Sequence, residues 1–211
     1  MSVASIVMHL AVGEKVNEVL NLDKKLFTLG NIAPDITKNT GIERSVTHFT
    51  DDYSNIPMVD KFFSKYKDCL SGPYEIGYLV HLITDELWFK EFIPNYELDN
   101  FFILKDGEKV GVDKKVFLKL LYNDYNYLNQ EVLDYYNLDL SVFYDEYEFP
   151  DTVIEEVPKM FFRTLVDGAG ALHYERYSES DYVLTLENVI AFIEYATSYV
   201  LDRLKDYGIL K

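Results

Sequence analysis

Apolar residues recur at helical spacing along most of the chain. From Val3 to Leu20 they occupy positions 6, 7, 10, 16 and 20, and near the C-terminus they form a stripe at 189, 192, 193, 196 and 200. Cap residues, prolines and glycines bound further helical segments at about 23–30, 57–70, 73–92, 113–136, 151–167 and 186–206. Because strand signals are almost absent, these six or seven helices predict an all-α bundle.

The expected boundaries follow from local capping rules. Ser2 is available as the N-cap of the first helix, Gly30 should end the second, and Asp113 can cap the long helix that follows it. The segment 101–112 carries a weak hairpin signal and could equally be an irregular lid. Since no repeat or linker divides the chain, residues 1–211 are expected to form a single domain.

Charge and cysteine content restrict the partners. Thirty-six acidic and twenty basic residues give a net charge of −16, which repels nucleic acids and anionic membrane surfaces. Small phosphate esters remain compatible with this charge, because a metal ion can reverse its sign inside a pocket. The absence of a long apolar stretch or a leader segment favours a cytoplasmic protein without stable membrane association. Cys69, the single cysteine, excludes a cysteine-rich zinc site and is expected to be a small buried thiol.

Two polar residues interrupt an otherwise apolar helical run, YLVHLITDELWF, at residues 78–89. His81 and Asp85 are four residues apart, so they lie on the same face of a helix. Because both side chains are costly to desolvate, they need a partner in the core. Either the two side chains form a hydrogen bond with each other, or both of them bind one metal ion.

Three further residues extend the set of candidate ligands. His9 stands on the apolar face of the first helix, and taken alone it indicates a satisfied core histidine, as does His48. Asp35 follows a proline that would hold its carboxylate rigidly, although such a residue often serves only the turn. Taken together with His81 and Asp85, they supply imidazole and carboxylate ligands suited to zinc or another divalent first-row metal.

The motifs MHLAVGEKV, LGNIAPDI, THF and GYLVHLITDELWF occur in this order within residues 6–90. They resemble the bacterial zinc-dependent phospholipase C family, whose all-α fold is shared with single-strand-specific zinc nucleases. The resemblance implies that His48, His81, Asp35 and Asp85 hold one zinc ion, and that His9 and the shared Asp85 contact a second. It also implies that Asp35 orients the attacking water and takes its proton.

Two departures from the family pattern reduce the expected number of metal ions. The large members use a freed N-terminal tryptophan, whereas this chain begins with Met1–Ser2. They also use a pair of histidines downstream of the HxxxD helix, and this chain has no second pair of histidines after His81. One or two zinc ions are therefore expected in place of three.

Other polar residues are weaker candidates. Glu86 and Asp124 are further candidates for oxygen ligands, although a solvated helix face is favoured for Asp124. His173 follows two glycines and is expected to be a surface or loop histidine. Arg44 and Lys38 could neutralise a phosphate, but solvated surface charges are the favoured interpretation.

The function predicted from these features is metal-dependent hydrolysis of a phosphoester bond in a small substrate by a metal-activated water. The alternative is a catalytically inactive, metal-stabilised helical domain with a binding or structural role. A phosphohydrolase of the HD type is disfavoured, because no adjacent His–Asp doublet occurs. The sequence leaves open the ester that is cut and the oligomeric state.

Overall fold

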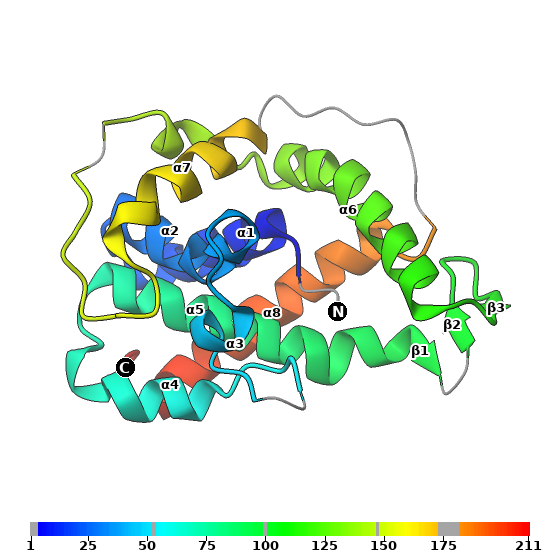
Figure 1. Ribbon diagram of the computed structural model, residues 1–211, viewed down its shortest axis with the longest axis horizontal. Helices are drawn as coiled ribbons and strands as arrows, with labels where there is room; N and C mark the ends of the chain where they lie inside the picture. The colour runs from blue at the N-terminus through cyan, green and yellow to red at the C-terminus, as the bar shows by residue number, and fades with distance from the viewer. Residues whose placement is uncertain (1–3, 52–53, 99–100, 147, 173–181) are drawn as a thin grey trace.

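The computed structural model describes residues 4–51, 54–98, 101–146, 148–172 and 182–211, and it is predominantly helical (Figure 1). The α-helices are α1 (Ile6–Leu20), α2 (Lys24–Ile32), α3 (Arg44–Thr47), α4 (Val59–Tyr66), α5 (Pro73–Leu87), α6 (Lys114–Tyr136), α7 (Phe162–Ala171) and α8 (Leu186–Asp206). Short 3-10 turns are η1 (Ala33–Asn39), η2 (Lys67–Cys69), η4 (Ile93–Asn95), η5 (Leu140–Phe143) and η6 (Lys159–Phe161), and η3 (Trp88–Phe92) is a π-helical turn. The predicted all-α class is confirmed.

One continuous apolar core joins these helices. Helices α1, α2 and α5 lie near the middle of the molecule, and α8 runs behind them and packs against α1 and α5 (Figure 1). The largest completely buried side chains are aromatic, among them Trp88, Phe117 and Phe162. Because every long helix contributes to this core, burial of the apolar stripes explains why the helical periodicity predicted the fold.

A small antiparallel sheet confirms the hairpin signal. It consists of β1 (Glu97–Leu98), β2 (Phe101–Ile103) and β3 (Lys109–Val110), in that order. Phe102 pairs with Val110, and the turn between β2 and β3 contains Gly107 at φ 83°, a left-handed conformation that glycine adopts without strain. The sheet lies at one end of the molecule beside the start of α6, away from α1 and α2 (Figure 1).

The helix boundaries correct several expectations. Helix α1 begins at Ile6, and its N-cap is Ser5, whose hydroxyl accepts from the backbone of Met8; the expected cap, Ser2, lies outside the described residues. Helix α2 does not end at Gly30 but continues to Ile32, because its C-terminal part is buried against α5. Asp113 caps α6 as predicted, and its carboxylate accepts from the backbone of Lys115 at 2.7 Å.

Three expected helices are shorter than predicted. The segment predicted at 57–70 is α-helical only in α4, from Val59 to Tyr66, and η2 continues it to Cys69. Residues 151–158 do not form a helix. They form an irregular segment before η6 and α7, and this segment buries the side chains of Ile154 and Val157 in the core. The α-helix that begins at Pro73 ends at Leu87, and five residues of π-helix continue it to Phe92.

The exposure of Cys69 and the apolarity of the helices bear on two further expectations. Cys69 is exposed, which corrects the expectation of a buried thiol: α4 ends at Tyr66, and the 3-10 turn that follows directs Cys69 outward. Among the described residues, no helix combines the length and apolarity that crossing a bilayer requires.

Helices α2 and α5 cross at glycines, and this crossing positions the candidate site. A Cβ atom built on Gly77 would overlap the backbone oxygen of Phe27, and one built on Gly30 would overlap the backbone oxygen of Tyr74. The two backbones are therefore in direct contact, which only glycine permits at these positions. Asn31 follows Gly30 and His81 lies one turn beyond Gly77, so the same contact brings these two residues together.

Candidate metal centre

The five residues predicted as metal ligands converge between α1, η1, α3 and α5. His9 comes from α1 and Asp35 from η1, His48 directly follows α3, and His81 and Asp85 lie one turn apart on α5. The three imidazoles and Asp85 are completely buried, whereas the side chain of Asp35 retains 19% of its exposure. Asp35 therefore connects the buried centre with solvent.

The Nε2 atoms of His48 and His81 each lie close to both Asp35 and Asp85. His48 Nε2 lies 3.2 Å from His81 Nε2, 3.6 Å from Asp35 Oδ1 and 3.5 Å from Asp85 Oδ2. His81 Nε2 lies 3.9 Å from the same oxygen of Asp35 and 3.9 Å from the same oxygen of Asp85. A tetrahedral zinc site with bonds of about 2.0–2.2 Å places its ligand atoms about 3.3–3.6 Å apart. The distances from His48 to the two carboxylates fall within this range, whereas the His48–His81 distance is slightly shorter and the distances from His81 to the carboxylates are slightly longer.

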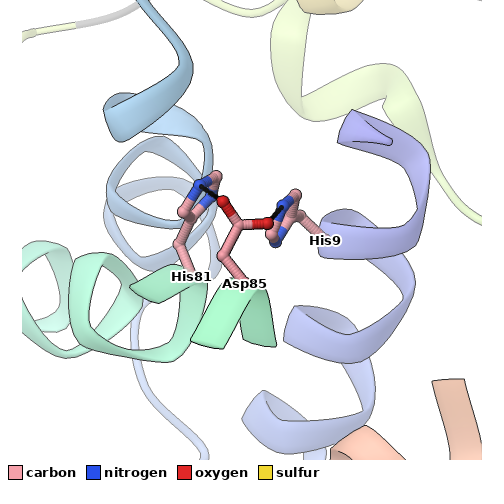
Figure 2. Close-up of side chains that lie close together, drawn as sticks. All are labelled: His9, His81 and Asp85. Atoms are coloured by element: carbon pink, nitrogen blue, oxygen red, sulfur yellow. Dashed lines mark ion pairs between the residues drawn. The ribbon is translucent and has the colours of Figure 1, made fainter. Parts of the chain in front are cut away.

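The second oxygen of Asp85 faces His9. Figure 2 shows Asp85 between His9 and His81, with one carboxylate oxygen directed toward each ring. His9 Nε2 lies 3.2 Å from Asp85 Oδ1, yet neither atom has a hydrogen bond of acceptable geometry. Buried polar atoms without a hydrogen bond are rare, and an ion shared by both atoms satisfies them. Asp85 is thus placed to serve two cation positions, one through each oxygen.

The tautomer of His81 follows from its backbone partner. His81 Nδ1 lies 2.7 Å from the carbonyl oxygen of Asn31, which can only accept a hydrogen bond. The proton of a neutral His81 is therefore on Nδ1, and Nε2 carries a lone pair directed into the centre. A hydrogen bond from the other ring nitrogen to a carbonyl is the usual way in which proteins orient a metal-binding histidine.

His48 is oriented in the same way. Its Nδ1 lies 2.8 Å from the hydroxyl of Thr47, and its Nε2 lies 2.6 Å from Arg44 Nη1, which can only donate. The Nε2 atoms of His48 and His81 thus both carry lone pairs, although they are 3.2 Å apart. Two lone pairs at this distance repel each other unless a cation binds both, so the centre has the donor arrangement of two ligands to one ion.

Burial keeps the imidazoles of His48 and His81 in their metal-binding form. It lowers the pKa of His81 to about 3, and the neighbouring His9 acts in the same direction. Burial also lowers the pKa of His48. For Asp85, burial opposes ionisation, but the adjacent Arg44 guanidinium, His9 and His81 together outweigh it and hold the pKa well below its ordinary value. At neutral pH the centre therefore offers the neutral imidazoles of His48 and His81 and the ionised carboxylate of Asp85.

The local backbone around His48 is strained. Phe49, the next residue, has φ 57°, a left-handed conformation that bulky residues rarely adopt. Its ring is buried against Phe62 at a centroid distance of 5.3 Å, and the hydroxyl of Tyr78 donates to the carbonyl of Thr47 at 2.5 Å. Packing and this hydrogen bond hold the turn, which directs His48 into the centre.

Arg44 belongs to the centre, contrary to the expectation of a solvated surface charge. Its Nη2 donates to Asp85 Oδ2 at 2.6 Å, and its Nη1 lies 3.9 Å from Asp35 Oδ1. The guanidinium also lies 5.7 Å from the ring centroid of Phe89, within the π-helical turn that follows α5. The sequence carried one signal for this placement, because Arg44 and His48 are four residues apart and α3 brings them to the same face.

The remaining candidates have other roles or lie outside the described residues. Glu86 is buried beside Asp85, but its carboxylate bonds Lys90 Nζ at 2.6 Å and belongs to neither group of side chains that could hold a metal ion. Those groups are His9, His81 and Asp85, and Asp35, His48 and His81. His173 is outside the described residues, and of Lys38 only the backbone is described.

Asp124 is completely buried, which corrects the expectation of a solvated helix face. Its carboxylate accepts hydrogen bonds from the backbone amides of Tyr182, Val183 and Leu184 at 2.7, 2.7 and 2.9 Å. It thereby fixes the segment before α8 to α6, and it belongs to neither group that could hold a metal ion.

Replacing Asp124 with asparagine should lower the free energy of unfolding by about 2 kcal/mol, because hydrogen bonds to a buried charge are lost. Urea unfolding followed by circular dichroism measures this loss. Asp134→Asn is the control, since Asp134 is exposed on the same helix and its replacement should change stability by less than about 0.5 kcal/mol. Equal stability of the two variants would contradict the structural role of Asp124.

Comparisons of this chain with protein-family models, with curated proteins and with solved structures find no match. The assignment of a function therefore depends on the residues and geometry of the centre.

Proposed function

We propose that this protein is a metal-dependent hydrolase of phosphoester bonds, with zinc as the preferred metal. The observation that carries the proposal is that the Nε2 atoms of His48 and His81 lie 3.2 Å apart and each lie 3.5–3.9 Å from a carboxylate oxygen of Asp35 and of Asp85. Mixed imidazole and carboxylate donors at such distances suit zinc and other divalent first-row metals. The orphaned atoms of His9 and Asp85 support a second ion, so we expect one or two.

In this proposal, different residues of the chain would bind the metal ion and accept the proton of the attacking water. A bound zinc ion supplies Lewis acidity and lowers the pKa of bound water toward 7. His48 and His81 act as neutral ligands, which Thr47 and Asn31 hold in orientation. Asp35 is the only predicted ligand with solvent exposure, so its carboxylate is placed to orient the attacking water and accept its proton.

The charge of the centre favours an anionic substrate. Arg44 adds a fixed positive charge next to the ligands, while the whole chain carries a net charge of −16. A small phosphate ester can approach such a local positive site, whereas a nucleic acid is repelled by the rest of the surface. The resemblance to zinc-dependent phospholipases C points to the same chemistry and remains a prediction.

Turnover of generic phosphoesters tests the proposal. The protein is stripped with a chelator, reloaded with zinc, and assayed with p-nitrophenyl phosphate and bis(p-nitrophenyl) phosphate. We expect hydrolysis to be at least about 100-fold faster in the reloaded sample and to fall again when chelator is added, because the proposed nucleophile is a water that the metal activates.

Two other outcomes of this assay would contradict the proposal. Zinc binding without turnover of either ester would overturn the hydrolase proposal and support the alternative, a metal-stabilised domain with a binding or structural role. If the protein bound no zinc, the metal centre itself would be refuted.

A further inference from the structure

Arg44 makes contacts that a metal ion would also need. Its guanidinium contacts His48 Nε2 and Asp85 Oδ2, each at 2.6 Å. The single lone pair on His48 Nε2 can accept from Arg44 or bind a metal ion, but it cannot do both. The guanidinium must therefore leave His48 when an ion binds there.

Metal binding also changes the net charge around the Arg44 guanidinium, and with it the kind of group that the guanidinium attracts. The carboxylates of Asp35 and Asp85 together with the Arg44 guanidinium carry one net negative charge, so one divalent ion leaves the centre with one net positive charge. Once the ion neutralises the carboxylates, the guanidinium loses most of its attraction to them. Its free donors and the positive excess then favour an anion.

The position of Arg44 suits this second partner. Its side chain is 21% exposed, whereas those of His48 and Asp85 are completely buried, so Arg44 lies on the solvent side of the centre with Asp35. Its Nε is buried and has no hydrogen-bond partner, which leaves one donor of the fork unused. A guanidinium fork binds two oxygens of a phosphate at once.

We propose that Arg44 binds the phosphate group of the substrate beside the metal ion, after the ion has displaced its guanidinium from His48. This inference rests on the proposed function and deepens it by assigning the anion-binding residue. It identifies the ligand of this residue as a tetrahedral oxyanion, and inorganic phosphate is the simplest probe.

The test measures two affinities in the wild-type protein, in Arg44→Met and in Arg44→Lys. Zinc affinity is measured by competition with a chromophoric chelator, and phosphate affinity of the zinc-loaded protein by titration calorimetry. Arg44→Met should bind zinc about tenfold more tightly, because a competing cation is removed. It should bind phosphate at least about tenfold more weakly, and Arg44→Lys should be intermediate because it keeps the charge without the fork.

Arg163→Met is the matched control. Arg163 is an exposed arginine on α7 paired with Asp167 at 3.7 Å, and its replacement should leave both affinities unchanged. The Arg44 variants are purified with zinc and checked by circular dichroism, since losing the guanidinium leaves Asp85 without its strongest partner.

The outcomes separate this inference from the proposed function. Phosphate affinity of zinc-loaded Arg44→Met equal to that of the wild type, or weaker zinc binding by this variant, would overturn the role of Arg44 alone. A wild-type protein that binds zinc but not phosphate would do the same. Failure of the wild-type protein to bind zinc would refute the proposed function, and the role of Arg44 with it.

Discussion

Replacing His81 with alanine should remove most of the bound zinc and abolish most of the stabilisation that zinc gives to the wild-type protein. His81 belongs to both groups of side chains that could hold a metal ion, so its loss takes an imidazole ligand from each group. An ion that binds only the folded state stabilises it by about 4 kcal/mol at 1,000 times its dissociation constant. For a chain of this size, zinc should raise the Tm of the wild-type protein by roughly 8–16 °C. In His81→Ala we expect this zinc-induced rise to be nearly absent.

Elemental analysis and calorimetry with and without zinc measure this effect. The alanine variant also loses the hydrogen bond to Asn31, so the informative quantity is the zinc-induced shift within each variant and not its absolute Tm. Glu86→Gln is the control, because Glu86 is the next acidic residue on α5 and bonds Lys90. We expect this variant to retain its zinc, and unchanged zinc content in His81→Ala would refute the centre.

Gly77→Ala should lower the free energy of unfolding by about 4 kcal/mol or prevent folding. The added Cβ would overlap the backbone oxygen of Phe27, and a backbone atom cannot move aside as a flexible side chain can. Overpacking a core costs about 1–3 kcal/mol when side chains can adjust, so a collision between two helix backbones should cost more. Urea unfolding of the zinc-free protein measures this change.

Gly168→Ala provides the matched helical control. A Cβ on Gly168, in α7, would meet nothing within 4 Å, so alanine should raise stability by about 0.5–1 kcal/mol through its higher helix propensity. If Gly77→Ala were as stable as Gly168→Ala, α2 and α5 would not be in the backbone contact described here.

Helical periodicity and caps predicted the long elements well, since these depend on local rules. Helix α6 begins after Asp113 and ends at Tyr136 as expected. The failures occur where tertiary packing overrides local preference. Gly30 reads as a helix terminator, but burial of the following residues against α5 carries α2 to Ile32. Residues 151–158 stay irregular, with Thr152 bonded to Glu75.

The centre was partly predictable from the sequence. The HxxxD spacing of His81 and Asp85 fixes their common face, and the structure brings them close to His9. The four-residue spacing of Arg44 and His48 was the only local signal for Arg44, and it did not outweigh the expectation that an arginine is solvated. The buried placement of Asp124 depends on a segment that is 58 or more residues distant in the chain, which no local spacing reveals.

The contact between α2 and α5 has a consequence for engineering. The distance between the two backbones is set by main-chain atoms at Gly30 and Gly77, not by the side chains that line the centre. Donor residues can therefore be exchanged, for example imidazole for carboxylate, while the frame that carries them keeps its dimensions. Such a frame makes the spacing of the two helices independent of the donor set, and it suits redesign of metal selectivity by ligand substitution.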